Sequence, residues 1–390
     1  MKTLFDKLSN VLRRELPRIK AHPRYLILAT LGIAFSYLFF LTLMRDGQPQ
    51  KLPIAIVDED GSYFSRRLCH EIEATQGVRV ARVYNSHKEA RAAMQRQEIY
   101  AFLHIPHGTY NDVLAFKAPH IVLYANNAYL LSGTLSYKQL MTICNLAAGA
   151  VQREVLRKKG MGEEQIMGLI MPIEIDAHLV GNPMANYQSY LLTTILPGIL
   201  GLMAILLTVF SIGMESREGT AGEWLAAADG RIGVALVGKL LPYACWFIAL
   251  QLLGNLVLFG FCQFPMQGHY LTLALCSVLF VLAMMSAGVF LYGLIPQMTN
   301  AICISAFYGI LAFSLSGFTY PVSGMARPLQ ALSVVFPLRQ NYLVYVNEAL
   351  FGLPLSYSYG HLCILVLFLL LPLITNSRIK KQILSHENAA

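Results

Sequence analysis

The sequence is poor in charge: Asp, Glu, Lys and Arg make up 13% of its 390 residues, where soluble globular proteins have roughly 25%. This deficit argues against an ordinary cytosolic enzyme. Hydrophobic residues reach 55% and the mean hydropathy is +0.50, which excludes a disordered chain. Seven cysteines in a chain of this length also exclude a small disulfide scaffold.

The charges that are present are unevenly spread. Residues 1–24 hold 9 of them and residues 45–188 hold 29, whereas residues 25–44 hold none and residues 189–390 only 14. The net charge of +8 divides into +5 for the head, +1 for residues 45–188 and +2 for the tail from Asn376. No basic nucleic-acid-binding face is expected, because the excess positive charge lies beside apolar segments, as is typical of membrane proteins.

Six apolar runs without Asp, Glu, Lys or Arg are predicted to cross a bilayer, whose hydrocarbon core is about 30 Å thick. A cleaved signal peptide is the alternative for the first run, but no small-residue cleavage site follows Leu43, so we expect it to remain as a span. Short inner segments carry 13 Lys and Arg against 2 in the short outer loops, which predicts that both termini are cytoplasmic. The runs lie near 25–44, 189–213, 240–262, 270–295, 298–319 and 358–375.

The absence of ionisable residues from these runs bears on the mechanism. Ion-coupled transporters usually keep a carboxylate or a cation at mid-membrane, so we expect any energy source to lie outside this chain. Small residues in the fifth run would let helices pack closely, with a lipid-facing position as the alternative. These packing candidates are Ser305, Gly309, Ala312 and Ser316.

Residues 45–188 are predicted to form an external α/β domain, because strand-like and helix-like patterns alternate there. Ser62 is expected to cap one helix, and Ser86 with Glu89 forms a capping box that opens a second, up to Glu98. A long helical pattern covers 130–159. The predicted strands are 51–58, 78–84, 100–106 and 120–124.

Two side-chain pairs in this domain invite a closer look. His104 and His107 form an H-x-x-H, but Pro106 breaks the helix that would place both on one face, so no metal site is expected. Cys69 and Cys144 form either a disulfide or two separately buried thiols, and we expect the thiols. Sequence alone does not show whether their Cα atoms approach within about 7 Å.

Gly233 to Lys239 matches G-x-x-x-x-G-K, the pattern of phosphate-binding loops. Leu240 follows where such a loop needs Ser or Thr to bind magnesium, and no buried strand precedes the pattern. We therefore expect no nucleotide site here. Lys239 is interpreted as an interfacial anchor at the cytoplasmic edge of the third span.

The preceding loop, residues 214–228, is predicted to be cytoplasmic and to contain a short helix. Thr220 and Glu223 have the spacing of a capping box that opens it. Trp224 and Leu225 give the helix an apolar side, which would lie along the membrane surface or insert into a partner's groove. A surface helix without further role is the alternative.

This loop resembles the coupling helix of the permeases of ABC type-2 exporters, with the pattern E-R-x-x-G-T-x-E-x-L. The matching residues are Glu215, Arg217, Glu218, Gly219, Thr220, Glu223 and Leu225, and Trp224 lies among them. Further segments resemble the family in the same order along the chain. They are the basic head, L-P-I-A-I-V-D-E-D at 52–60, G-K-L-L-P at 238–242, G-F-T-Y-P at 317–321, Met325, and Phe336 with Pro337.

The resemblance implies a bacterial inner-membrane protein with six spans per subunit. It implies a second permease subunit, either an identical chain or a similar paralogue, and a separate cytoplasmic ATPase subunit that binds ATP and magnesium. The loop residues named above would couple to that ATPase. Large external domains in this family are associated with a periplasmic adaptor protein and envelope export.

Two further segments complete the prediction. The basic head, with Leu4, Leu8 and Val11 at helical spacing, is expected to form an interfacial helix that binds membrane lipid or contacts the cytoplasmic partner. Residues 320–355 contain four prolines, so they are expected to form short re-entrant helices instead of a span, with an ordered loop as the alternative. An external gate is predicted there, made of Phe318, Tyr320, Pro321, Met325, Phe336 and Pro337.

The predicted fold is therefore an α-helical membrane protein with six transmembrane helices and an α/β extracytoplasmic domain between the first and second. The functional hypothesis is a permease subunit of an ATP-driven exporter, with no catalytic residue and no bound cofactor of its own. A membrane-anchored sensor or assembly receptor is the alternative, although one or two spans would suffice to hold it. The expected parts are 1–24 (head), 25–44 (first span), 45–188 (external domain), 189–375 (five-helix domain) and 376–390 (cytoplasmic tail).

Overall fold

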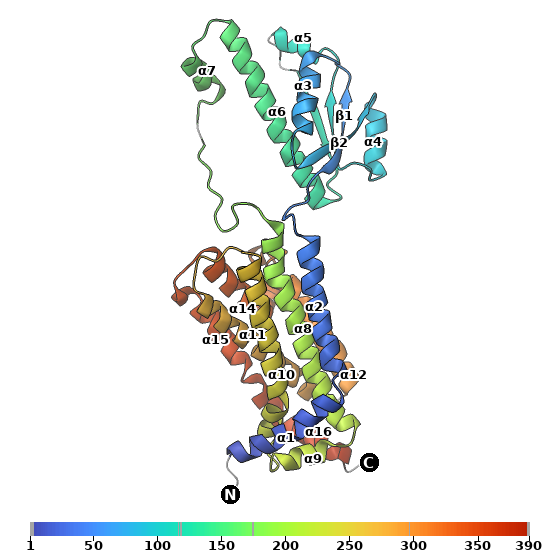
Figure 1. Ribbon diagram of the computed structural model, residues 1–390, viewed down its shortest axis with the longest axis vertical. Coiled ribbons are helices and arrows are strands. Elements are labelled where there is room, and N and C mark those ends of the chain that lie inside the picture. Colours follow the sequence, from blue (N-terminus) through green and yellow to red (C-terminus); the bar gives the residue numbers. More distant parts are fainter. Residues whose placement is uncertain (1–3, 116, 118, 174, 296, 388–390) are drawn as a thin grey trace. The chain divides into compact units, whose positions relative to one another are not determined.

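The computed structural model describes residues 4–115, 117, 119–173, 175–295 and 297–387 (Figure 1). The chain divides into two compact units. Unit 1 comprises Met1–Gly47 and Leu179–Ala390, and unit 2 comprises Gln48–His178. Each unit has its own hydrophobic core.

Unit 1 contains six helices that are long and apolar enough to cross a membrane, among the residues that the structure describes. The prediction of six such helices is confirmed. Four are single helices: Arg24–Leu43 (α2), Tyr187–Arg217 (α8), Tyr270–Leu294 (α11) and Met298–Leu315 (α12). The span Ile232–Phe261 combines α10 (Ile232–Asn255) with the π-helix η1 (Leu256–Phe261). The span Tyr359–Gln382 combines α15 (Tyr359–Phe368) with most of α16 (Leu371–Glu387).

Three of these helices extend several residues beyond the uncharged runs, among them α16, which continues past residue 375 into the predicted tail. Helix α8 continues past residue 213 to Arg217, and α10 begins at Ile232, well before residue 240. The added turns carry Glu215 and Lys239, which are 1% and 3% exposed. The expectation that the spans lack ionisable residues is therefore wrong for α8 and α10, because a buried charge is tolerated where it is paired.

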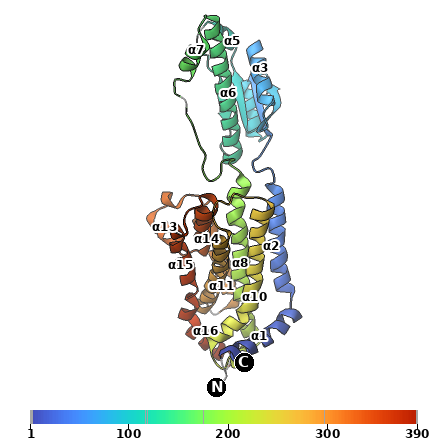
Figure 2. The same ribbon diagram turned by 60° about the vertical axis from the view of Figure 1, so that its left-hand side comes forward.

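Helix α8 is the central helix of unit 1 (Figure 2). In an 18-residue apolar stretch of α8, 67% of the residues are buried inside the protein, whereas the corresponding share in α2 is 11%, so α2 is peripheral. Close approach depends on small residues: a Cβ added at Gly201 of α8 would lie 2.7 Å from the ring of Phe280 in α11. The core therefore forms where α11 and α12 pack on α8.

The four predicted packing residues, three in α12 and Ser316 directly after it, are buried. Ser305, Ala312 and Ser316 are at most 1% exposed, and Gly309 is buried too. A Cβ at Gly309 would approach Leu202 of α8 to 2.5 Å. The small residues therefore bring α12 close to α8 within one chain, and the lipid-facing alternative is wrong.

The segment 320–355 contains two short α-helices, α13 (Arg327–Ser333) and α14 (Pro337–Tyr345), with 7 and 9 residues. A π-helix follows at Val346–Leu350 (η3). The prediction that this segment is too broken to span is confirmed, because a spanning helix needs about 20 residues.

Unit 2 is built on a four-stranded sheet in the order β2-β1-β3-β4. Strand β1 pairs in parallel with β2 and β3, and β4 runs antiparallel to β3. The strands are Leu52–Asp58 (β1), Val78–Tyr84 (β2), Ala101–Ile105 (β3) and Val122–Ala125 (β4). The helices are Tyr63–Glu73 (α3), His87–Gln95 (α4), Thr109–Leu114 (α5), Leu130–Lys158 (α6) and Glu163–Ile170 (α7).

Successive side chains of β1 point to opposite faces of the sheet, and both faces are buried. Ile54 and Ile56 of β1 contribute to a core with residues of α3 and α6, whereas Ala55 and Val57 point to the other face and pack with residues of α4. Figure 1 shows the sheet between these helices. A strand buried on both faces reads as a continuous apolar run, as residues 52–57 do.

Local details of unit 2 test the smaller predictions. Ser62 caps α3, accepting a hydrogen bond from the Ser65 amide at 3.1 Å, and Ser86 accepts one from Glu89 at 3.4 Å. Helix α4 ends at Gln95, short of the predicted Glu98. Cys69 and Cys144 are free thiols that pack beside the same core, so the disulfide alternative is wrong.

Candidate functional site

The loop between α8 and α10 forms a compact assembly with the amino-terminal helix α1 (Leu4–Ala21). Its short helix α9 (Ala221–Ala227) packs against α1, α8 and α10. Glycines with left-handed backbone stand on both sides of α9, Gly219 with φ +69° and Gly230 with φ +74°. Because glycine adopts this conformation without steric cost, the chain can turn sharply into and out of α9.

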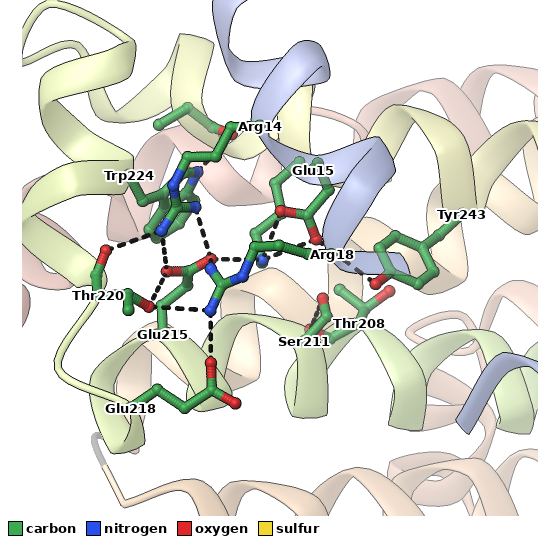
Figure 3. A network of polar contacts seen from close by, with 12 residues as sticks. Arg14, Glu15, Arg18, Thr208, Ser211, Glu215, Glu218, Thr220, Trp224 and Tyr243 are labelled. Atoms are coloured by element: carbon green, nitrogen blue, oxygen red, sulfur yellow. Dashed lines mark hydrogen bonds and ion pairs between the residues drawn. The ribbon is translucent and has the colours of Figure 1, made fainter. Parts of the chain in front are cut away.

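Glu215, near the end of α8, is the centre of a buried ion network (Figure 3). The guanidinium of Arg14 donates to both of its oxygens at 2.9 Å, and Arg18 donates to Oε1. Lys239 Nζ donates to Oε1 at 2.7 Å, and the Thr220 hydroxyl donates to Oε2 at 2.6 Å. One carboxylate thus binds groups from α1, the loop and α10.

Lys239 bridges two carboxylates. Its Nζ lies 2.9 and 3.0 Å from the oxygens of Glu15 in α1 and 2.7 Å from Glu215, and both carboxylates are at most 2% exposed. The same nitrogen lies 5.7 Å from the ring centre of Trp224. Trp224 is fully buried and its indole N–H donates to the Ala235 carbonyl at 3.1 Å, so α9 packs directly beside the network.

The charges of this network balance. Three cations, Arg14, Arg18 and Lys239, face three carboxylates, Glu15, Glu215 and Glu218, and Arg18 donates to Glu218 at the exposed edge. Partial burial would lower the pKa of Arg18, but its hydrogen bond to Glu215 and the surrounding carboxylates raise it above the usual value. Arg18 therefore stays charged in its partly buried position.

Further contacts hold the same elements. Lys7 of α1 pairs with Asp229 after α9 at 2.5 Å, and Lys380 of α16 donates to the Gly230 carbonyl at 2.8 Å. Helices α1 and α10 also touch closely, since a Cβ at Gly238 would lie 2.8 Å from Val11. Val11 and Glu15 of α1 are buried against protein, whereas Leu4, Phe5 and Leu16 stay exposed, so α1 contacts the loop and also keeps an apolar surface.

Three predictions for this loop are wrong in detail. Thr220 precedes α9, but its hydroxyl makes no capping bond and donates to Glu215 instead. Trp224 and Leu225 do not form an apolar surface, because they are 0% and 6% exposed and pack inside unit 1. Lys239 is no interfacial anchor, because it lies within α10 and binds Glu15 and Glu215.

The eight predicted coupling residues therefore divide into two groups. Glu215, Thr220, Trp224 and Leu225 face the interior or the ion network. Those on the exposed side are Arg217, Glu218, Gly219 and Glu223. Glu223 lies 4.0 Å from Arg14 with 78% of its side chain exposed, so this ion pair is weak.

The sequence prediction missed the partners of Glu215. Arg14, Glu15 and Arg18 lie in the basic head, for which only an interfacial helix was predicted. A usable signal was present, because a glutamate in line with Leu8 and Val11 on an apolar face needs a cation when it is buried.

The predicted gate residues do not form one cluster of exposed side chains. Phe336 is 3% exposed and stacks on Tyr308 with ring centres 4.9 Å apart, and Pro337 begins α14 beside it. Phe318 is 4% exposed, and its carbonyl accepts a hydrogen bond from Tyr190 of α8. The remaining members, Tyr320, Pro321 and Met325, are exposed or half-buried.

Candidate metal and nucleotide patterns have other structural roles. His104 lies in β3 with Nε2 3.2 Å from Glu59, and His107 Nδ1 is 3.2 Å from the Glu59 carbonyl. Within the described ranges, no group of three or more His, Cys, Asp or Glu is arranged to hold a metal ion. The segment from Gly233 to Lys239 is helical, in α10, and forms no loop.

Comparison with known proteins gives one match. A family model described as ABC-2 family transporter protein matches residues 23–378, which leaves α1 outside the matched region. No curated protein matches the chain, and neither does any solved structure.

Proposed function

The chain belongs to the ABC-2 family of transporter proteins, and we propose that it is the permease subunit of an exporter driven through α9 by a separate cytoplasmic ATPase. In this proposal the ATPase binds and hydrolyses ATP with magnesium, and the permease provides the route through the membrane. The chain itself is not a catalyst.

The observation that carries this proposal is the two-sided character of α9. One side is buried: Trp224 donates to the Ala235 carbonyl of α10, and Thr220, just before α9, donates to Glu215 in the ion network of α1, α8 and α10. The other side presents Glu223, and Arg217 at the end of α8 and Glu218 in the turn before α9 are exposed nearby. A partner that moves the exposed side would therefore displace two long apolar helices directly, which is what coupling requires.

The orientation follows from the same assignment. If α9 meets a cytoplasmic ATPase, both termini are cytoplasmic, unit 2 lies on the outer side of a bacterial inner membrane, and the segment 320–355 faces outward as the gate. Two permease subunits, identical or paralogous, would form the functional pair, with a periplasmic adaptor protein as a further partner of the external domain. An apolar route suits amphiphilic drugs, lipids and polymers.

Co-purification with a charge reversal on α9 tests the proposal. We expect tagged full-length protein to bring down an ATPase from its native membranes, and Glu223→Arg to reduce the recovered ATPase by about tenfold, equivalent to ~1.4 kcal/mol of binding free energy. Glu223 is chosen because its side chain is mostly exposed, so the protein should fold normally.

Glu164→Arg is the matched control, since it makes the same change of charge at an exposed position in α7 of unit 2. It should recover ATPase at the wild-type level. An exporter role fails if no ATPase is recovered with the wild-type protein, and the assignment of α9 fails if Glu223→Arg and Glu164→Arg recover equal amounts.

A further inference from the structure

Away from the ion network, unit 1 encloses a small polar cavity between α8, α10, α11 and α14. It has room for the centre of a water-sized sphere over about 10 Å³. Six of its ten lining residues have polar side chains, and all six are at most 7% exposed. They are Thr193, Gln251, Asn255, Ser277, Asn341 and Tyr345.

Two polar atoms in this lining have no hydrogen-bond partner among the described residues: Gln251 Oε1 and the Tyr345 hydroxyl. The Gln251 amide nitrogen donates to Asn255 at 3.3 Å, and Asn255 donates to Ser277 at 2.8 Å. Exchanging oxygen and nitrogen of the Gln251 amide would leave the nitrogen unpaired instead, so one end of this amide lacks a partner in either orientation.

The neighbouring Thr193 hydroxyl meets only part of the deficit. It donates to the Ser189 carbonyl of its own helix at 3.0 Å and is near enough for a weak interaction with the Tyr345 hydroxyl, which has one donor and two acceptor sites and so has room for a further partner. More than nine in ten buried polar groups in proteins are paired, either with protein atoms or with ordered water. A buried water typically needs two to four polar partners and a cavity of roughly 10–15 Å³.

We propose that this cavity is a binding site for one water molecule, which bridges Gln251 Oε1 of α10 and the Tyr345 hydroxyl of α14. The volume admits a single water, and both orphaned atoms line it. The six polar side chains are all amides or hydroxyls, so no carboxylate in the lining would compensate a buried cation. The ligand is therefore a neutral donor and acceptor.

The water gives α10 and α14 a hydrogen-bonded link that their side chains do not make directly at these positions. Helix α14 belongs to the segment 320–355, and α10 carries Lys239 of the ion network. On the proposed function, which this last step assumes, the water would connect the gate segment to a helix moved by the coupling loop.

The test has two arms on the full-length protein. In a high-resolution density map, we expect a water between the two atoms at ~2.7–3.0 Å from each. In unfolding titrations with SDS in mixed micelles, Gln251→Leu and Tyr345→Phe should be non-additive by at least about threefold in the unfolding equilibrium constant. Tyr342→Phe, a half-buried tyrosine on the same helix outside the cavity lining, should be additive with Gln251→Leu.

Three results would overturn the site. They are an empty cavity in a map that shows other buried waters, a bound species with contacts well below 2.7 Å, which indicates a cation, and a Gln251–Tyr345 pair as additive as the control. None of these readouts depends on an ATPase. A failure of the proposed function would therefore leave the water site intact, and the reverse also holds.

Discussion

Replacement of Glu215 by glutamine probes the centre of the ion network. Glutamine keeps the size of the side chain but removes the charge, and its amide nitrogen must then face an arginine or lysine donor. Arg14, Arg18 and Lys239 would keep only Glu15 as a buried carboxylate, with Glu218 and the weakly paired Glu223 at the exposed edge, which leaves the buried part of the network with excess positive charge.

The expected loss of stability is substantial. Removing one partner of a buried ion pair destabilises a protein by about 3–5 kcal/mol. The side chains of Arg14 and Arg18 are 17% and 28% exposed and can turn toward water, so we expect the lower end of that range, about 3 kcal/mol. At about 2–4 °C per kcal/mol for a unit of this size, the apparent melting temperature should fall by roughly 6–12 °C.

Tryptophan fluorescence provides a local readout of the same change. The chain has two tryptophans, so a Trp246→Phe background leaves Trp224, on the buried side of α9, as the only indole. With Glu215→Gln, the Trp224 emission should shift to longer wavelength at a lower temperature than in the parent. This early shift would report that α9 loosens before the rest of unit 1 unfolds.

Glu223→Gln is the matched control for this experiment. It lies in the same loop and loses the same charge, but its side chain is mostly exposed and its only described ion pair is at 4.0 Å from Arg14. Its melting temperature should match that of the parent. Equal melting temperatures for the Gln variants at 215 and 223 would refute the argument that the buried carboxylate holds the loop.

Two further predictions concern packing and thiol chemistry. Gly238→Ala should destabilise unit 1 by ~1–3 kcal/mol because the new Cβ would lie 2.8 Å from Val11. Gly233→Ala is the control and should not destabilise it, because its nearest neighbour is 3.6 Å away. Equal thermal stability of the two variants would contradict the close contact of α1 and α10. Burial, with Asp58 and Glu73 nearby, raises the pKa of the Cys69 thiol to about 11. At pH 8, iodoacetamide should therefore alkylate Cys69 at least ~100-fold more slowly in the folded protein than in the unfolded protein. The alkylation rate, followed by peptide mass spectrometry, should rise about tenfold per pH unit toward pH 10. A rate that levels off near pH 9 would contradict the raised pKa.

The spans were predictable from sequence because burial in lipid requires long uncharged runs, and these are visible residue by residue. The helix ends were not. A run is read as ending at its first charge, yet α8 continues through Glu215 and α10 begins before Lys239. Glu215 and Lys239 neutralise each other only in the folded chain. Their pairing also involves α1, which precedes both residues by about two hundred positions in the sequence.

The loop was located from its pattern, but the roles within it were partly inverted. Trp224 looked like a surface group because a short helix with one apolar side is typical of a docking element. Its burial depends on α1 and α10, which close over it, and no local pattern reports that. Glu15 carried the one local hint, since a carboxylate on an apolar stripe must find a cation to be buried.

The position of α1 determines how a movement of α9 would spread. Helix α1 supplies Arg14, Glu15 and Arg18 to the network, whose other buried charges are Glu215 of α8 and Lys239 of α10, so α1 cannot separate from these two helices without a cost of several kcal/mol. A movement of α9, which Thr220 and Trp224 join to this network, is therefore favoured when α1 and the adjoining ends of α8 and α10 move with it. Because α1 ends at Ala21 and α2 begins at Arg24, such a movement would reach the first span as well as α8 and α10. The head outside the matched family region thus makes three spans respond to one loop.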